Sequence, residues 1–290
     1  MPLMGMVGKI LFFFSILLPA GVAVAQTVAQ PSAAPLADIR QLIEQVKEHQ
    51  RQLNKVRENY TYTSMQSTQD IDGNGQVKKT ETAEYEVFYV NSHVVARKVK
   101  KDGKPLDEPE EKKETERVTK EAEMAAKTPP DQLVEREQQV SIYQMLGLME
   151  VRNPRRENYK GRSAIVFDFV GRKDAKTHGL IEDASKKLEG TLWVDEADRQ
   201  VAHMDVRFID NFRVAGGLLA TIQKGSSFHF DQSLVNGELW LPTGAEASVE
   251  ARVLLVKGVR QHFTERDYDF KRFHVEAQTG KDAKAVEGAK

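Results

Sequence analysis

Polar and apolar residues alternate along three runs in the first third of the chain, 59–71, 76–90 and 93–99. In the second run Tyr85, Val87 and Tyr89 share one face, and this period of two is typical of strands buried on one side. The sequences Asp-Gly-Asn-Gly at 72–75 and Asp-Gly-Lys-Pro at 102–105 are turn signals. The pattern therefore predicts an antiparallel meander of three strands.

The stretch from Leu188 to Val275 predicts a longer series of strands, around which the rest of the chain is arranged. Its best-defined element is a hairpin in which Asn236-Gly237 joins 227–235 to 238–241, because Asn-Gly accepts the positive φ of a two-residue turn. A tight bend or bulge is expected at Gly216-Gly217. Further strands are expected at 188–194, 201–209, 218–223, 247–257 and 259–273.

Residues 159–171 read as a strand with two apolar faces, interrupted only by Asp168, and we expect this strand to be central. It and the first meander should continue the sheet of the C-terminal stretch. The predicted fold class is α+β, with a curled antiparallel β-sheet that forms an incomplete barrel and is covered by helices.

Three segments have helical features. Residues 39–56 carry one apolar stripe, which predicts an amphipathic helix packed on the sheet or, in a second interpretation, a gate over a pocket. Residues 107–123 are mostly charged and have almost no apolar stripe, so a helix there should be solvated and mobile. A second docking helix is expected to begin at Asp131 and to end near Gly147 and Asn153-Pro154, and 172–187 should form a long polar loop.

The N-terminus has the three parts of a secretory signal peptide. Lys9 precedes an apolar run from Ile10 to Leu18, and small residues at 23–25 form a cleavage site. The run is short for a membrane span, although a retained anchor is the alternative. We expect a signal peptide at 1–25, a flexible lead at 26–37, one β-rich domain at 38–275 with a charged helical insertion at 107–130, and a disordered tail at 276–290.

Composition narrows the class of protein. Its 42 basic and 43 acidic residues give a formal net charge of −1, so nothing favours nucleic acid or an anionic surface. The chain contains no cysteine, which excludes disulfides and thiol catalysis. Together with the signal peptide, these features predict a periplasmic protein, or an extracellular one, that is not integral to the membrane.

The sequence contains no recognisable catalytic or metal-binding motif. His203 and Asp205 share a strand face, as do His229 and Asp231, but such pairs are common on polar sheet faces. No histidine lies at metal-ligand spacing, and neither a phosphate loop nor a Gly-x-Ser-x-Gly elbow is present. We therefore expect no metal, no cofactor and no enzymatic activity, although a carboxylate pair for glycoside hydrolysis depends on three-dimensional spacing.

Large apolar side chains are concentrated in the C-terminal strands. The simplest interpretation is an ordinary core; the functional interpretation is that a concave face of the curled sheet encloses an apolar ligand. The candidate lining residues are Trp193, Phe208, Phe212, Phe228, Phe230, Trp240, Val253 and Leu255.

Three short motifs carry a resemblance to a known family. They are the segment 188–195 ending in Trp-Val-Asp, the return strand 199–206, and Leu-Trp-Leu-Pro at 239–242. In these the chain resembles the LolA/LolB-type periplasmic carriers, the outer-membrane lipoprotein-sorting-like proteins. The resemblance covers about the last 110 residues. It implies an incomplete antiparallel barrel around helices, with an apolar cavity for acyl chains or another hydrophobic ligand. The family's functional arginine does not match one particular position of this chain, so no individual site residue is carried over.

Three hypotheses of function follow. The first is an exported protein without catalytic activity that binds a hydrophobic ligand, a lipid or the acyl chain of a lipoprotein, in envelope transport. The second is a scaffold that docks an envelope protein partner through the charged segment and the first helix. The third is an envelope hydrolase acting through carboxylates that the sequence does not identify.

Overall fold

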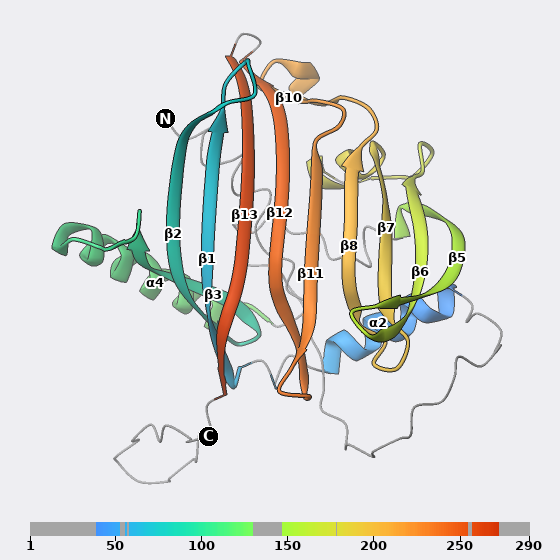
Figure 1. Cartoon of the computed structure of the whole chain (residues 1–290), viewed down its shortest axis with the longest axis horizontal. Coiled ribbons are helices and arrows are strands. Elements are labelled where there is room, and N and C mark those ends of the chain that lie inside the picture. Colours follow the sequence, from blue (N-terminus) through green and yellow to red (C-terminus); the bar gives the residue numbers. More distant parts are fainter. Residues whose placement is uncertain are drawn as a thin grey trace.

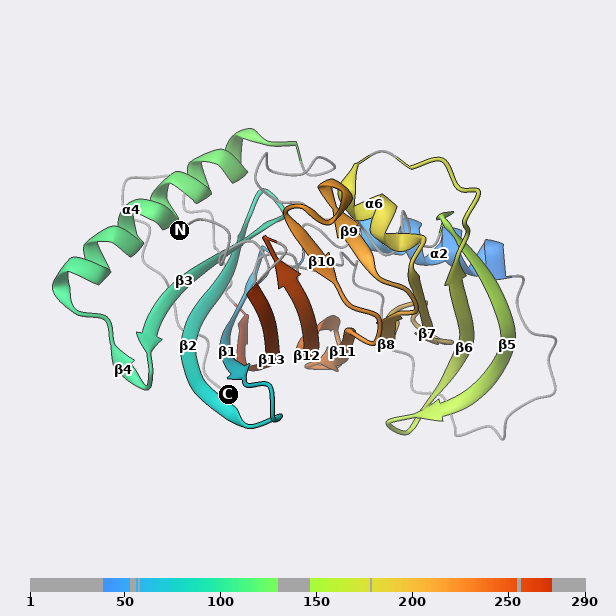
Figure 2. The same ribbon diagram turned by 90° about the horizontal axis from the view of Figure 1, so that it is seen from above.

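The computed structural model describes residues 39–52, 56, 58–129, 147–177, 179–254 and 257–272. Most of these residues belong to one antiparallel sheet with the strand order β4-β3-β2-β1-β13-β12-β11-β8-β7-β6-β5 (Figure 1). The edge strands β4 and β5 do not pair with one another, so the sheet of the described strands is open. Seen from above, it is curved (Figure 2).

Most neighbouring strands are consecutive in the chain, apart from β1 with β13 and β8 with β11. The short strands β9 and β10, which come between β8 and β11, pair with one another, and β10 also pairs with β12. The pairing of β1 with β13 joins the first meander to the C-terminal stretch, so the meander continues that sheet as expected. The strands are β1 Tyr60–Ile71, β2 Val77–Val90, β3 His93–Lys101, β4 Lys104–Pro105, β5 Met149–Tyr159, β6 Arg162–Gly171, β7 Leu188–Asp195, β8 Val201–Phe208, β9 Phe212–Val214, β10 Ala220–Ile222, β11 Ser227–Val235, β12 Leu239–Val253 and β13 Lys257–Arg272.

Three sequence expectations about the strands are corrected. β5 was not expected as a strand because it is rich in charge and contains Pro154, but it is the edge strand and the proline lies where its register with β6 shifts. β6 is consequently next to the edge rather than central. β12 is one long strand where two were expected. A β-bulge next to Pro242, where the register with Asp231 and Gln232 shifts, lets the strand continue past the proline.

The helices are α2 Ile39–Gln52, α4 Glu108–Lys127 and α6 Leu180–Ser185, with a 3-10 turn, η1, at Ala215–Gly217. Leu42 and Val46 of α2 are buried in a cluster with strands β5–β8 and β11, as expected of an amphipathic helix. α6 lies inside the segment predicted to be a loop. No helix of the described residues is long and apolar enough to cross a membrane. The segments expected as signal peptide, lead and tail, and most of the second docking helix, lie outside the described residues.

The charged helix α4 contacts strand β3, whereas the sequence predicted a solvated and mobile segment. Glu114 accepts a hydrogen bond from the backbone N–H of Lys98 at 2.6 Å, Arg117 donates to the carbonyl of Ala96, and Glu111 pairs with Arg97. The helix therefore docks through polar contacts, which an apolar stripe cannot reveal. Asp107 caps it by accepting from the N–H of Glu110 at 2.9 Å.

Cross-strand partners in an antiparallel sheet share one side, so the register separates the two sides. One row of partners runs Phe167–Leu192–Met204–Phe230–Ala245–Glu265–Gln66. The adjacent residues form a row Asp168–Thr191–Asp205–His229–Glu246–Thr264–Ser67. We call the first the helical side, because Leu42 of α2 packs against it, and the second the polar side.

The motif residues that carried the family resemblance have structural roles at one end of the sheet. Asp195 is buried, accepts from the N–H groups of Ala197 and Asp198, and pairs with Arg162. Trp240 donates its indole N–H to Asp198 at 2.9 Å, and the Arg162 guanidinium lies over its ring. These contacts fix the turn between β7 and β8 against β12.

Candidate functional site

Two of the eight residues proposed to line a cavity lie side by side on the helical side. Phe228 and Phe230 of β11 have nearly parallel rings with centroids 6.4 Å apart. Phe230 is buried in the large cluster that contains Leu42, and Phe228 packs against that cluster.

The other proposed residues are distributed over separate parts of the fold. Trp193 is on the polar side, in line with His203, and Trp240 belongs to the cluster around Tyr60. Phe208 and Phe212 are in a small cluster with α6, and Val253 is half-buried where β12 ends. Leu255 lies outside the described residues. The described members of the set therefore belong to different clusters of side chains, and a role for any of the eight residues in binding stays a prediction.

A strip of small residues runs along the helical side of β12. Ala245, Ala247, Val249 and Ala251 occupy every second position of this strand; Ala245 is partly buried, and the other three are at most 9% exposed. Ala247 has Phe228 as its cross-strand partner on β11 and Phe263 on β13. Aromatic side chains therefore flank a line of side chains that are one to three carbons long. Sequence reasoning missed this strip because it looked for large apolar residues.

Polar side chains lie at one end of the strip. Ala245 is the cross-strand partner of Glu265, Asp267 is the next residue of β13 on the same side, and Ser64 is the partner of Asp267. Gln232 follows Phe230 on the same side of β11. Asp267, Ser64 and Gln232 are at most 5% exposed. Both carboxyl oxygens of Asp267, the Ser64 hydroxyl and both amide atoms of Gln232 lack a hydrogen-bond partner in the part of the chain that the structure describes.

Burial sets the protonation of the two carboxyl groups. Removal from water raises the pKa of Asp267 to about 7, against a small opposing effect of the Ser64 hydroxyl. The pKa of Glu265 is also raised, first by burial and then by the charge of Asp267, while the Gln66 amide, which donates to it at 3.0 Å, lowers it. Burial therefore favours the protonated, neutral form of both carboxyl groups.

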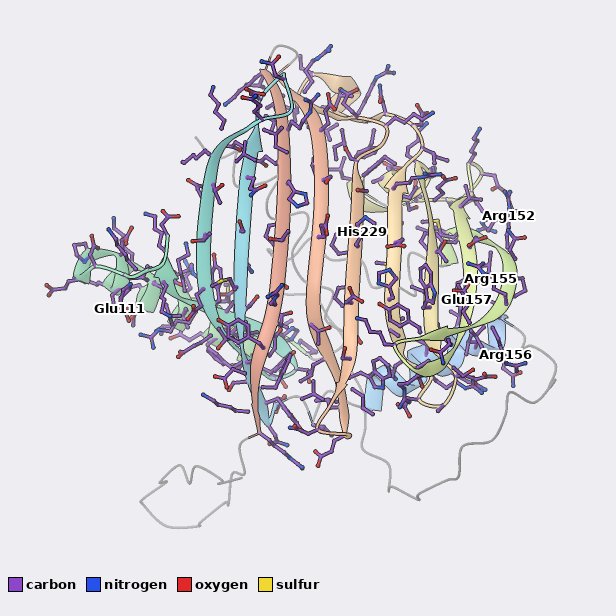
Figure 3. All side chains as sticks on the ribbon, viewed as in Figure 1. Glu111, Arg152, Arg155, Arg156, Glu157 and His229 are labelled. Atoms are coloured by element: carbon purple, nitrogen blue, oxygen red, sulfur yellow. The ribbon has the colours of Figure 1, made fainter. Side chains whose placement is uncertain are left out.

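The polar side has a hollow of about 550 Å³ lined by charged and hydroxyl side chains. Asp168 accepts hydrogen bonds at its rim from Asn153, Arg155 and Thr191, at 3.0–3.1 Å. Arg155 and Glu157 lie beside one another on β5, and His229 projects from β11 (Figure 3). Arg155 and Glu157 do not line the hollow; besides Asn153, Asp168, Thr191 and His229, its lining residues are Arg152, Phe169, Val170, Glu189, Gly190, Asp205, Val206, Arg207 and Ser227.

A hydrogen-bonded network adjoins this hollow. His203 lies between two carboxylates, 3.0 Å from Asp205 and 3.2 Å from Asp231, and its ring stacks on Tyr159. Asp231 also accepts from Tyr159 and, at 2.8 Å, from Lys160. The sequence pairs His203 with Asp205 and His229 with Asp231. In the structure each histidine also contacts the aspartate of the neighbouring strand, His203 with Asp231 and His229 with Asp205. No three His, Asp or Glu side chains among the described residues are arranged to hold a metal ion.

The hydrogen bonds of the network favour the negative form of Asp231 and the positive form of His203. Burial raises the pKa of Asp231, but hydrogen bonds from His203, Lys160 and Tyr159 outweigh it and lower the pKa of this carboxyl well below its usual range. Burial lowers the pKa of His203, and the hydrogen bond to Asp231 and the charge of Asp205 raise it by more. These groups are satisfied by one another, which is typical of a structural network as much as of a reactive site.

Comparison with known proteins gives distant structural likeness only. No protein-family model matches the chain, and no curated protein matches its sequence. Similar solved structures include a DUF1329 family protein from Desulfovibrio piger, with 10% identity, a TM-score of 0.32, and coverage of 80% of this chain and 90% of that one. An outer membrane lipoprotein-sorting protein domain from Vibrio parahaemolyticus has 11% identity, a TM-score of 0.29, and coverage of 84% and 95%.

The Pseudomonas aeruginosa MucA/MucB complex is a third similar structure, with 9% identity, a TM-score of 0.24, and coverage of 79% of this chain and 94% of that one. Nothing about the function of this chain follows from similarity of this degree.

Proposed function

We propose that this chain is a periplasmic binding protein without catalytic activity, and that its ligand carries an apolar chain held on the helical side along β12. The observation that supports the proposal is the strip of small side chains from Ala245 to Ala251 between flanking phenylalanines. The predicted signal peptide supports the location. A lipid or the acyl chain of a lipoprotein has the required chemistry.

The strip has a suitable length for such a ligand. The six residue steps from Ala245 to Ala251 span roughly 20 Å at the rise of an extended strand. Transfer of each methylene group from water to an apolar surface contributes about 0.8 kcal/mol, so an acyl chain of about ten carbons would gain enough to offset its loss of freedom on binding. The small side chains of the strip matter to the proposal, because larger side chains at these positions would occupy the volume that the ligand chain is proposed to fill.

The proposal is tested by filling the strip. Ala245→Phe adds an aromatic ring at a half-buried position of the strip, and we expect uptake of the uncharged fluorophore N-phenyl-1-naphthylamine to weaken by about tenfold, since ~1.4 kcal/mol of contact is enough for that change. The matched control is Ser248→Phe, which adds the same ring on the exposed polar side of β12. The control should bind like the natural protein.

The purified protein offers a second readout. Extraction and mass spectrometry should recover lipid from the natural protein and less from Ala245→Phe. Protein that is free of lipid and does not take up the fluorophore would contradict the proposal. Equal loss of uptake in both phenylalanine variants would show that binding does not occur on the helical side.

A second candidate is recognition of a polar protein segment on the polar side, favoured by the hollow of about 550 Å³ between Asp168 and His229. Arg207, which pairs with Glu189 there, is largely exposed. If this candidate is right, Arg207→Glu should abolish the capture of an envelope partner and leave fluorophore uptake unchanged.

The hydrolase hypothesis also has an observation in its favour, the two carboxyl residues Glu265, which is partly buried, and Asp267, which is buried, on the same side of β13. Neither residue lines the hollow on the polar side. A catalytic role predicts turnover of envelope polysaccharide that is lost in Asp267→Asn, whereas a binding role predicts none in either protein.

A further inference from the structure

We propose that Glu265, Asp267, Gln232 and Ser64 form a head-group subsite for an ammonium ion, so that the ligand is an amphiphile with a primary amine at the polar end of its chain. The inference rests on the proposed function, because it places the head group where the strip along β12 ends. It adds a selectivity that an apolar strip alone does not have.

The position of the subsite follows from the register. Ala245, the first small residue of the strip, is directly opposite Glu265 on β13, and Phe230 is its partner on β11. Asp267 and Gln232 each lie two residues further along on the same side of β13 and β11. A chain lying on Ala247 and Val249 therefore has its end beside these polar groups.

The second observation is the lack of partners. Buried polar atoms in folded proteins nearly always have a hydrogen-bond partner, because an unpaired one costs about 1–3 kcal/mol. Here five polar atoms on Asp267, Ser64 and Gln232 lie on the helical side without a hydrogen bond of ordinary geometry among the described residues, although the Ser64 hydroxyl faces Asp267 and lowers its pKa. A bound group that donates hydrogen bonds there would satisfy the acceptor atoms among them, the Asp267 carboxyl oxygens, the Ser64 hydroxyl oxygen and the Gln232 carbonyl oxygen.

The charge of the missing group follows from the residues around it. Arg266 lies between the two carboxyl residues on β13 but its side chain points to the polar side, where its partner is Met65. Lys98, in the row of Ser64 and Tyr85, has its ammonium group over the Tyr85 ring. Within the described ranges no basic side chain pairs with Glu265 or Asp267. A cation is the group that this arrangement lacks.

An ammonium ion matches the subsite better than the other cations. It donates three N–H hydrogen bonds, and the carboxyl oxygens of Asp267 and Glu265 and the carbonyl oxygen of Gln232 are able to accept them. A divalent metal requires more oxygen ligands, typically six or more for calcium, and the described residues contain no group of three metal-ligating side chains. Burial also strengthens a charge-assisted hydrogen bond relative to water.

The experiment compares three amphiphiles with the same twelve-carbon chain, dodecylamine, dodecanol and dodecanoate, as competitors of N-phenyl-1-naphthylamine at neutral pH. We expect the amine to displace the fluorophore at a concentration about tenfold lower than the alcohol, as one charge-assisted hydrogen bond suffices for this difference, and dodecanoate to be the weakest. Asp267→Asn and Glu265→Gln should remove the preference for the amine without weakening dodecanol.

The matched control is Glu246→Gln, which removes an exposed carboxylate on the polar side of the neighbouring strand β12. It should leave the preference for dodecylamine unchanged. Thermal unfolding without ligand provides a second readout, because Asp267→Asn should raise Tm if the carboxyl is retained for a ligand and lower it if the carboxyl is structural.

The outcomes separate the two proposals. If all three amphiphiles displace the fluorophore equally, the head-group subsite is wrong and the apolar strip stands. If none does so, and the fluorophore itself does not bind, both proposals are wrong. A preference for the amine that persists in Asp267→Asn and Glu265→Gln would also overturn the subsite.

Discussion

Asp231 on the polar side and Asp267 on the helical side belong to strands separated only by β12, yet their surroundings differ completely. Asp231 accepts hydrogen bonds from a histidine, a lysine and a tyrosine, and its pKa is lowered. Asp267 has no hydrogen-bond partner among the residues described, and burial raises its pKa to about 7. The difference indicates that the polar side is a completed network and the helical side is not.

The comparison suggests where a ligand is needed. Charged groups that satisfy one another hold strands together without any further molecule. Unpaired polar groups that are buried cost free energy, and proteins retain them mainly where function requires it. The predictions below test this distinction, beginning with the largest effect.

The largest effect is expected from Leu42→Ala. Leu42 is fully buried where α2 packs against the helical side, and truncation of such a leucine costs about 2–5 kcal/mol of unfolding free energy. Urea denaturation measures the loss. The control is Leu218→Ala, at an exposed leucine, which should change the unfolding free energy by less than about 0.5 kcal/mol. Equal effects would mean that α2 does not pack on the sheet.

The next effect concerns the completed network. Asp231→Asn leaves His203 and Lys160 without their carboxylate partner, and we expect a loss of about 1–2 kcal/mol at neutral pH, since the side chain is one third exposed. Because its folded pKa is lowered, the carboxylate stabilises the fold above the unfolded pKa of about 4 and loses that effect as the pH falls below it. The variant should therefore lose less stability than the natural protein on acidification.

Asp267→Asn should have the opposite sign. The pKa of Asp267 is raised in the folded protein, because the buried carboxyl is more stable when protonated and neutral. The free energy of unfolding should therefore be highest at low pH. It should fall as the pH rises from about 4, the pKa in the unfolded chain, through about 7, the pKa in the folded protein. We expect the variant to be more stable than the natural protein at pH 8 and to show a flatter profile between these values. A variant that is less stable at pH 8 would show that Asp267 has a structural partner.

The smallest effect is expected on α4. Glu111→Gln removes an ion pair with Arg97 in which both side chains are about two-fifths exposed (Figure 3), and such pairs are worth at most about 1 kcal/mol. Thermal unfolding should show little change at low salt and none at high salt. A large loss would mean that α4 contributes to the fold as much as α2 does.

Local patterns in the sequence predicted most of the strands but not their order. Alternation identified β1, β2 and β3, and Asn236-Gly237 identified the hairpin of β11 and β12. The pairing of β1 with β13 joins residues about 200 positions apart, and no local pattern encodes it. β5 was missed because Arg155, Glu157 and their neighbours are polar on both faces of the strand, so no apolar alternation marks it. Its place in the sheet depends on pairing with β6 and on contacts such as the hydrogen bond from Trp193 of β7 to Glu157.

The candidate site was less predictable than the fold. Large aromatic residues suggested a cavity, but Trp193 and Trp240 donate hydrogen bonds to Glu157 and Asp198 in structural networks. The strip along β12 consists of residues too small to attract notice, and its significance depends on Phe228 and Phe263 of the neighbouring strands. Similarly, Glu265 and Asp267 are two acids among many until the register places both on the helical side, where Asp267 is buried and Glu265 partly buried.

The most direct test of the central claim is to determine which side of the sheet a bound chain touches. A dodecylamine with a photoreactive diazirine on its chain can be cross-linked to the protein and the labelled residues identified by mass spectrometry. We predict labels at Phe228, Ala247 and Phe263 on the helical side, lost in Ala245→Phe. Labels confined to the hollow between Asp168 and His229 on the polar side would contradict the account.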